Sequence, residues 1–130
     1  MKNRNKKLII ILLSLILLLA AVLRLWGIER FPAGLNADEA AIGYNAYSLI
    51  LTGKDEHGSS WPIHFQSFND YKPGLYFYLV LPFVRILGLN VLAVRLPSAI
   101  LGILSVWLIY LLIKELFENE VWGLLSAFFL

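Results

Sequence analysis

Two short groups of charged residues in this sequence could support chemistry. The first is the acidic pair Asp38 and Glu39, and the second is the stretch NDYKP at residues 69–73. A carboxylate within hydrogen-bonding reach can take a proton from a hydroxyl group or bind a metal ion. A lysine at a membrane surface can bind the phosphate of a lipid. We therefore expect both groups to border one pocket at a membrane surface, where a lipid phosphate would lie.

The same residues also have structural roles open to them. Asn36 can cap a helix with Glu39 as its capping-box partner, and acids in a first turn suit the helix dipole. Asp70 can form an Asx turn, Lys72 can extend its amine to the membrane surface, and Pro73 can occupy the first turn of a helix. The residues alone leave the structural and the functional interpretations open.

The remaining candidates for chemistry carry little weight. His57 and His64 stand alone, with no second ligand at metal-binding spacing, so a solvated or structural role is favoured for both. The sequence has no cysteine and therefore no disulfide or thiolate metal site. No phosphate-binding loop, dinucleotide fingerprint, nucleophile elbow or zinc signature occurs. Any chemistry therefore rests on the two charged groups.

The elements that must position these groups are predicted to lie in a membrane. Of the 130 residues, 59% are hydrophobic and 15% are charged, and the mean hydropathy is +0.73, which is too apolar for a soluble domain of this length. The net charge is only +2, and no stripe of basic residues indicates a nucleic-acid partner. We expect an all-α, polytopic transmembrane protein in contact with membrane lipids.

Apolar segments define the predicted spans. Residues 8–26 would cover roughly 28 Å as a helix, which is enough for one crossing, although a signal peptide is the competing interpretation. Two further spans are predicted at residues 75–89 and 96–113. Residues 121–130 read as the start of a fourth span, so we expect the sequence to be the N-terminal part of a longer protein and to be inactive alone.

The basic residues set the predicted orientation. Residues 1–7 carry four lysines and arginines and are assigned to the cytoplasm by the positive-inside rule. The turn at residues 90–95 is assigned to the same side because Arg85 and Arg95 flank it. The segments 27–74 and 114–120 are then extracytoplasmic. The expected location is the plasma membrane, with several crossings.

The segment 27–74 is too long for a simple connection and is expected to carry function. Within it, residues 37–51 predict a helix that ends at Gly53, where glycine can adopt a left-handed conformation. Its apolar residues, including Tyr44, favour a position on the bilayer surface or beneath the spans.

These motifs, taken together, resemble the membrane glycosyltransferases of the GT-C class. The resemblance lies in the acidic pair after the first span, the tyrosine-containing helix, Trp61-Pro62, Lys72-Pro73 and the sequence RLPSA at residues 95–99. It covers residues from about 8 to 125, and it is closest to bacterial relatives of the protein O-mannosyltransferases and of the aminoarabinose transferase. The resemblance implies a multi-span enzyme of the cell envelope that transfers a sugar from a polyprenyl-phosphate carrier. The acceptor would be a lipid, a glycan or a protein.

The resemblance also implies roles for individual residues. Asp38 would be the general base, with Glu39 as its partner or as a structural cap. Lys72 would bind the carrier phosphate, and Arg95 is expected to be structural or to contact lipid. Substrate-binding positions are also expected at three further residues, Asp70, Tyr71 and Tyr44.

The sequence departs from the aminoarabinose branch beside the lysine. Tyr71 stands where that branch commonly has an acid, and Gly74 stands where it has a second proline. A metal ligand at Asp70 is therefore not predicted, and no cofactor is indicated, although a divalent metal stays open.

Two other classes of function stay open as well. In a transporter or flippase-like protein the acids and Lys72 would form a substrate path, but such groups usually lie within spans near the midplane. In a non-catalytic assembly subunit, Asp38 and Glu39 would be only a helix cap. Replacement of Asp38 separates these classes, since it should abolish transfer only in an enzyme.

Overall fold

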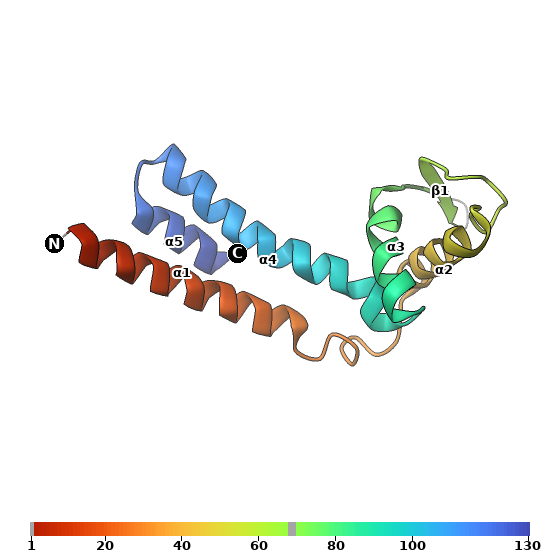
Figure 1. The fold of residues 1–130 in the computed structure, drawn as a ribbon, viewed down its shortest axis with the longest axis horizontal. Coiled ribbons are helices and arrows are strands. Elements are labelled where there is room, and N and C mark those ends of the chain that lie inside the picture. The colour runs from red at the N-terminus through yellow and green to blue at the C-terminus, as the bar shows by residue number, and fades with distance from the viewer. Residues whose placement is uncertain (1, 68–69) are drawn as a thin grey trace. The chain divides into compact units, whose positions relative to one another are not determined.

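The computed structural model describes residues 2–67 and 70–130, so Asn69 of the NDYKP stretch lies outside the described residues. The chain forms two compact units, and we name them by their content. The helical unit comprises the residues up to 26 and residues 98–130, and the mixed unit comprises residues 27–97. The elements in chain order are α1 (Lys2–Leu25), α2 (Ala37–Thr52), β1 (His64–Ser67), β2 (Asp70–Pro73), α3 (Leu75–Leu87), α4 (Val91–Leu116) and α5 (Glu120–Phe129) (Figure 1).

The described chain is mostly helical, but the all-α prediction needs one correction. Strands β1 and β2 pair in antiparallel fashion within the segment that the sequence predicts as loop. Each strand has four residues, so the alternation of polar and apolar positions is too short to distinguish it from a loop. The register places Phe65 opposite Lys72 and Ser67 opposite Asp70.

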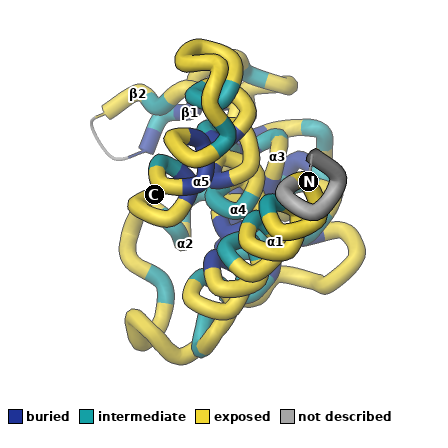
Figure 2. Tube along the Cα trace, turned by 90° about the vertical axis from the view of Figure 1, so that its left-hand side faces the viewer, coloured by how far each residue is buried: buried dark blue, intermediate teal, exposed yellow. Residues whose placement is uncertain are grey.

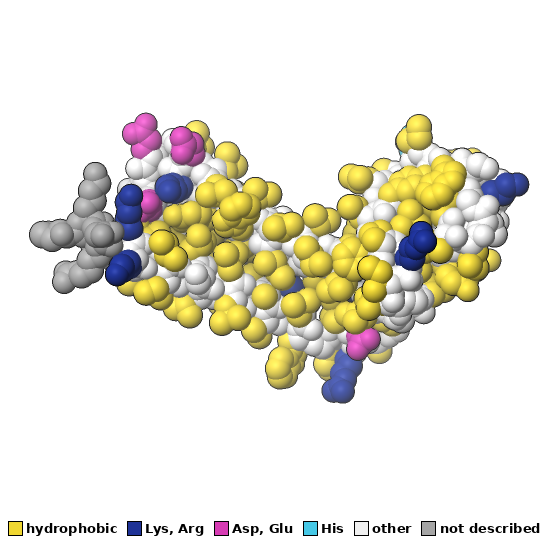
Figure 3. Space-filling view, in the orientation of Figure 1, with side chains coloured by type: hydrophobic (Ala, Val, Ile, Leu, Met, Phe, Trp, Pro, Cys, Tyr) yellow, Lys and Arg dark blue, Asp and Glu magenta, His cyan; other side chains and the backbone are white. Residues whose placement is uncertain are grey.

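The helical unit is a small bundle of α1, α5 and the part of α4 from Ser98 onward. Outside the contact between these helices, α1 is exposed along most of its length (Figure 2). On the face shown in Figure 3, hydrophobic side chains cover much of this unit, and charged side chains gather at the end where α4 turns into α5. Its buried core consists of Ala20, Val106, Tyr110, Leu124 and Ala127.

Two helices among the described residues are long and apolar enough to cross a membrane, namely Lys6–Leu25 and Val91–Leu116. An exposed apolar surface of this extent is unstable in water and is typical of a protein in contact with lipid. The helices therefore support a membrane location.

Helix α3 does not match the second span that the sequence predicts at residues 75–89. It has 13 residues and would extend only about 20 Å, against about 30 Å for the hydrocarbon core of a bilayer. Its buried residues pack on α2 instead, and the ring centroids of Phe77 and Phe65 lie 4.1 Å apart. Composition identified an apolar helix here, but its apolar face is used for packing within the mixed unit.

One contact bears on the predicted sidedness of the later turns. The sequence assigns Glu39 to the outer side and Arg95 to the cytoplasmic side, yet the Arg95 side chain donates hydrogen bonds directly to the Glu39 carboxylate. The cytoplasmic position of residues 90–95 stays a prediction, and this contact favours a position on the same side as Glu39.

The turn between α4 and α5 is affected in the same way. One cavity is lined by Leu12 and Leu15 of α1 together with Leu124 of α5, and a second joins Leu23 of α1 to Leu130. Helices α1 and α5 thus run in the same direction, and the turn at residues 114–120 lies at the N-terminal end of α1 (Figure 1). The prediction that this turn lies opposite the N-terminus stays a prediction, and the parallel course of α1 and α5 favours a position on the same side.

The core of the mixed unit forms where α2 packs on α3 and on the first turn of α4. Ala46 of α2, Val80 and Val84 of α3, and Val94 of α4 are all buried there. Gly43 allows this close approach, because a Cβ atom at its position would lie 2.8 Å from Cγ2 of Val94. The packing fixes α2, and α2 carries the candidate acids.

Candidate active site

The N-terminus of α2 is fixed by the predicted capping box. The Asn36 side chain accepts a hydrogen bond from the backbone N–H of Glu39 at 2.8 Å. In return, the Asn36 backbone N–H donates to Oε2 of Glu39 at 3.1 Å. The helix ends, also as predicted, at Gly53 in the left-handed conformation with φ of 70°. These contacts confirm the structural role that the sequence offers Glu39.

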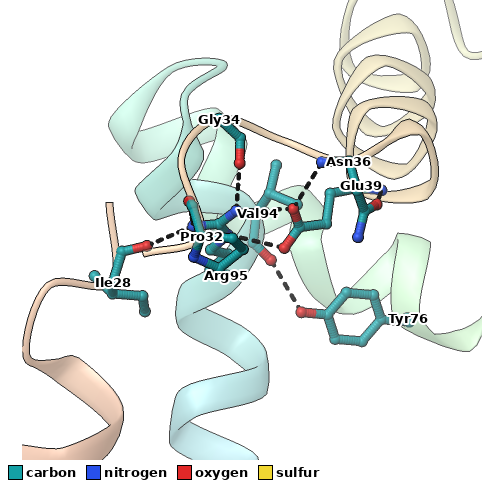
Figure 4. A network of polar contacts seen from close by, with 8 residues as sticks. All are labelled: Ile28, Pro32, Gly34, Asn36, Glu39, Tyr76, Val94 and Arg95. Carbon is teal, nitrogen blue, oxygen red and sulfur yellow. Dashed lines mark hydrogen bonds and ion pairs between the residues drawn. The ribbon is translucent and has the colours of Figure 1, made fainter. Parts of the chain in front are cut away.

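Arg95 extends this cap into a larger network, shown in Figure 4. Its Nε and one terminal nitrogen donate to the two carboxylate oxygens of Glu39 at 2.8 and 2.9 Å. Its remaining N–H groups donate to the backbone carbonyls of Ile28, Pro32 and Gly34 at 2.5 to 3.0 Å. Arg95 is only 8% exposed, and all five of its donors have partners. It therefore joins the start of α4 to the loop before α2 and to α2 itself.

Glu39 is held by this network and cannot reach a substrate without breaking it. The hydrogen bond from Arg95 holds the pKa of the Glu39 carboxyl below its ordinary value, and the Asn36 backbone N–H acts in the same direction. Burial opposes the shift but does not cancel it. The sequence indicates that Glu39 is a catalytic residue or a cap, and the geometry favours the cap.

Asp38 lies one residue earlier and has a different environment. Its carboxylate forms an ion pair with Nζ of Lys72 on β2, 34 positions later in the chain. The Asp38 side chain is 66% exposed, whereas that of Lys72 is 20% exposed. The fold thus brings the two predicted groups together, with the carboxylate open to solvent and the amine partly covered.

The pleat of the hairpin explains which NDYKP side chain reaches Asp38. Residues opposite each other on an antiparallel pair share a face, so Lys72 lies on the same face as its partner, the fully buried Phe65. Tyr71 alternates to the other face and is 66% exposed, away from the ion pair. Asp70 is exposed, and its carboxylate accepts a hydrogen bond from the backbone N–H of Tyr71.

Tyr44 lines a cavity of about 470 Å³ beside α2, and this cavity contains residues that the sequence does not point out. Glu56, His57 and Ser67 line it with Tyr44, and alanines of α2 form the rest of its wall. Their proximity depends on Asn45, which is fully buried and bonds to both the side chain and the backbone of Glu56. A buried asparagine within an apolar helix is the only sequence signal that could have indicated this contact.

The arrangement can perform two chemical tasks. The exposed Asp38 carboxylate can accept a proton, and Lys72 can bind an anion next to it. In the described part of the chain, no group of three or more histidine, aspartate or glutamate side chains is placed to hold a metal ion. Asp38 and Lys72 are the predicted site residues that the fold joins in an ion pair.

Comparison with known proteins adds one finding. Residues 71–130 match the family model described as dolichyl-phosphate-mannose-protein mannosyltransferase. No curated protein and no solved structure matches the chain significantly. The matched region includes Lys72 and Arg95, whereas Asp38 and Glu39 precede it. The match supports the family rather than a particular member, and with it a membrane glycosyltransferase of the mannosyltransferase type.

Proposed function

We propose that this protein acts as a membrane glycosyltransferase that transfers a sugar from a polyprenyl-phosphate carrier to a hydroxyl group of a lipid, glycan or protein. The observation that supports it most is the ion pair of Asp38 and Lys72, which sets a proton acceptor beside an anion-binding amine. The family match over residues 71–130 independently supports the class of reaction. With the N-terminus in the cytoplasm, the whole mixed unit would lie on the extracytoplasmic face.

In the proposed reaction, Asp38 takes the proton of the acceptor hydroxyl while the hydroxyl oxygen attacks C1 of the donor sugar. The bond between C1 and the phosphate oxygen breaks, and its electron pair leaves with the carrier phosphate. Lys72 stabilises the negative charge that develops on this phosphate. Attack from the face opposite the leaving group inverts the configuration at C1.

The ion pair also gives an order to substrate binding. Without substrate, the Lys72 amine and the Asp38 carboxylate form an ion pair with each other. A carrier phosphate competes with Asp38 for the amine, because both are oxygen anions that accept charge-assisted hydrogen bonds. Once the phosphate has bound Lys72, the Asp38 carboxylate is free to accept a hydrogen bond from the acceptor hydroxyl.

Glu39 and Arg95 have a positioning role in this proposal. They fix the first turn of α2, and Asp38 belongs to that turn. A misplacement of a catalytic group by about 1 Å can cost a hundredfold in rate. The network therefore matters for turnover although it does not contact the reacting atoms.

The test is the consumption of radiolabelled polyprenyl-phosphate sugars by membranes that contain the full-length protein. Asp38→Asn keeps the shape of the side chain but removes the base, and it should lower transfer by at least about a hundredfold. The matched control is Glu29→Gln, which neutralises an exposed acid outside the site. Near-normal transfer by Asp38→Asn contradicts the role of Asp38. No consumption of any donor by the wild type contradicts the proposed reaction and favours transport or assembly.

A further inference from the structure

We propose that the cavity beside α2 binds the pyranose ring of a monosaccharide. This inference deepens the proposed function and rests on it for the identity of the substrate class. The cavity has a volume of about 470 Å³, within the range of about 300 to 1,000 Å³ that is typical of small-molecule sites. It lies entirely within the mixed unit.

The wall of the cavity combines an apolar surface with an aromatic ring. Ala37, Ala40, Ala41 and Tyr44 follow one another at helical spacing along one face of α2. The small alanine side chains leave room for a ring, and Tyr44 provides both an aromatic face and a phenolic hydroxyl. A sugar ring has an apolar face of C–H groups and a rim of hydroxyls, so it matches both parts of this wall.

The polar groups of the lining are held in place before any ligand arrives. Asn45 donates to Oε1 of Glu56 at 2.8 Å and accepts from the Glu56 backbone N–H at 2.9 Å. Asp55 is buried and accepts hydrogen bonds from the backbone N–H groups of His57 and Ser59. The loop that presents Glu56 and His57 is therefore preorganised, which reduces the entropy lost on binding.

Ser67 provides the observation that most directly indicates a ligand. The residue is 2% exposed and lines the cavity. Among the described residues its hydroxyl oxygen has no hydrogen-bond partner. A buried hydroxyl without a partner costs free energy, and a ligand hydroxyl in the cavity would remove that cost.

The charges of the cavity select the sugar and not the phosphate. Glu56 contributes a carboxylate, and no lysine or arginine is found among the described residues that line the cavity. An anionic phosphate would be repelled there, whereas the hydroxyls of a neutral ring can donate to a carboxylate. Asp38 does not line the cavity, but it follows the cavity residue Ala37 in the first turn of α2. A ring in the cavity would thus lie within one helical turn of the backbone of the proposed base, while the phosphate would lie toward Lys72.

The test measures binding of methyl pyranosides to the full chain in detergent micelles by saturation-transfer NMR. Binding does not require turnover, so this readout is independent of the proposed reaction. Ser67→Ala and Glu56→Gln should each weaken binding by about tenfold or more, the scale of one lost hydrogen bond to a ligand. His64→Ala on β1 and Tyr47→Phe on α2 should leave pyranoside binding unchanged.

Ser67→Ala separates a ligand role from a structural one. Because its hydroxyl has no described partner, the variant should unfold at the same temperature as the wild type or at a higher one while it binds the sugar more weakly. Equal pyranoside binding by the wild type, Ser67→Ala and Glu56→Gln would overturn the proposal, as would the absence of saturation transfer in the wild type. Inorganic phosphate is the negative probe, and its binding in the cavity would also overturn it.

Transfer kinetics of the full-length protein distinguish whether the ring belongs to the donor or to the acceptor. If Ser67→Ala raises KM for the carrier-linked donor alone, the cavity holds the sugar of the donor. If it raises KM for a glycan acceptor alone, the cavity holds the acceptor. Weaker pyranoside binding by Ser67→Ala, together with normal donor consumption by Asp38→Asn, would support the cavity and contradict the proposed base, so the two failures are distinct.

Discussion

Asp38 and Glu39 are consecutive residues of α2, yet their carboxylates bind cations from different elements of the fold. Asp38 pairs with Lys72 of β2, and Glu39 pairs with Arg95 of α4. Consecutive positions on a helix are separated by about 100°, so neighbouring side chains point to different sides. The exposed pair of Asp38 and Lys72 is suited to acid–base and anion-binding chemistry. The network around Arg95 is suited to holding α2 in place.

Replacement of Lys72 should affect the donor more than the acceptor. We expect Lys72→Ala to raise KM for the polyprenyl-phosphate sugar by about tenfold or more, because a charge-assisted hydrogen bond to the phosphate is lost. Steady-state kinetics with each substrate varied in turn would measure the effect. The released Asp38 carboxylate is largely exposed, so water replaces its partner and the fold should persist.

The control for this prediction is Lys54→Ala, which removes an exposed lysine from the same unit. It should leave both KM values unchanged. If Lys72→Ala weakens the use of donor and acceptor equally, the lysine supports the fold and does not bind the carrier.

Arg95 should not be replaceable by lysine. Lysine cannot reproduce the bidentate contact with Glu39 or reach all three backbone carbonyls, so Arg95→Lys should destabilise the mixed unit. Hydrogen exchange of the α2 amides in detergent would report the loss. Arg85→Lys, an exposed change in the last turn of α3, is the matched control. Unchanged protection in Arg95→Lys would contradict a structural role for the network.

The stability of the network should depend on pH through Glu39. Its folded pKa is lower than the ordinary value of 4.5, so the folded state favours the ionised carboxylate. The stabilisation is complete above pH 4.5 and is lost as the pH falls below 4.5 through the folded pKa. The unfolding temperature of the wild type should decline over that window, and that of Glu39→Gln should start lower and decline less. Parallel pH profiles for the two proteins would contradict this assignment.

The position of the turns can be tested by labelling, because the sequence contains no native cysteine. Single cysteines would be introduced as Glu29→Cys, Ile86→Cys and Glu115→Cys, all at exposed positions. A membrane-impermeant maleimide should label the first two from one side of intact vesicles and the third from the other. Labelling of Ile86→Cys from the side opposite Glu29→Cys, with Glu115→Cys labelled from the same side as Glu29→Cys, would restore the span that the sequence predicts at residues 75–89.

The sequence by itself determined the local features of this protein. The two long apolar helices, the helix that starts after Asn36 and the stop at Gly53 each depend on contiguous residues, so composition and capping patterns suffice to predict them. The candidate residues Asp38 and Lys72 could also be identified, because a charge beside an apolar segment is unusual in any fold.

Only the tertiary structure decided which of these residues meet. The sequence predicts residues 75–89 as a span, since an apolar helix that packs in a protein core and one that packs in lipid have the same composition. This one choice sets the predicted side of every later turn, and it hides the contact of Arg95 with Glu39, 56 positions away. The cavity of Tyr44, Glu56 and Ser67 likewise depends on strand pairing and on one buried asparagine. Such contacts come from the packing of distant segments, which local periodicity does not encode.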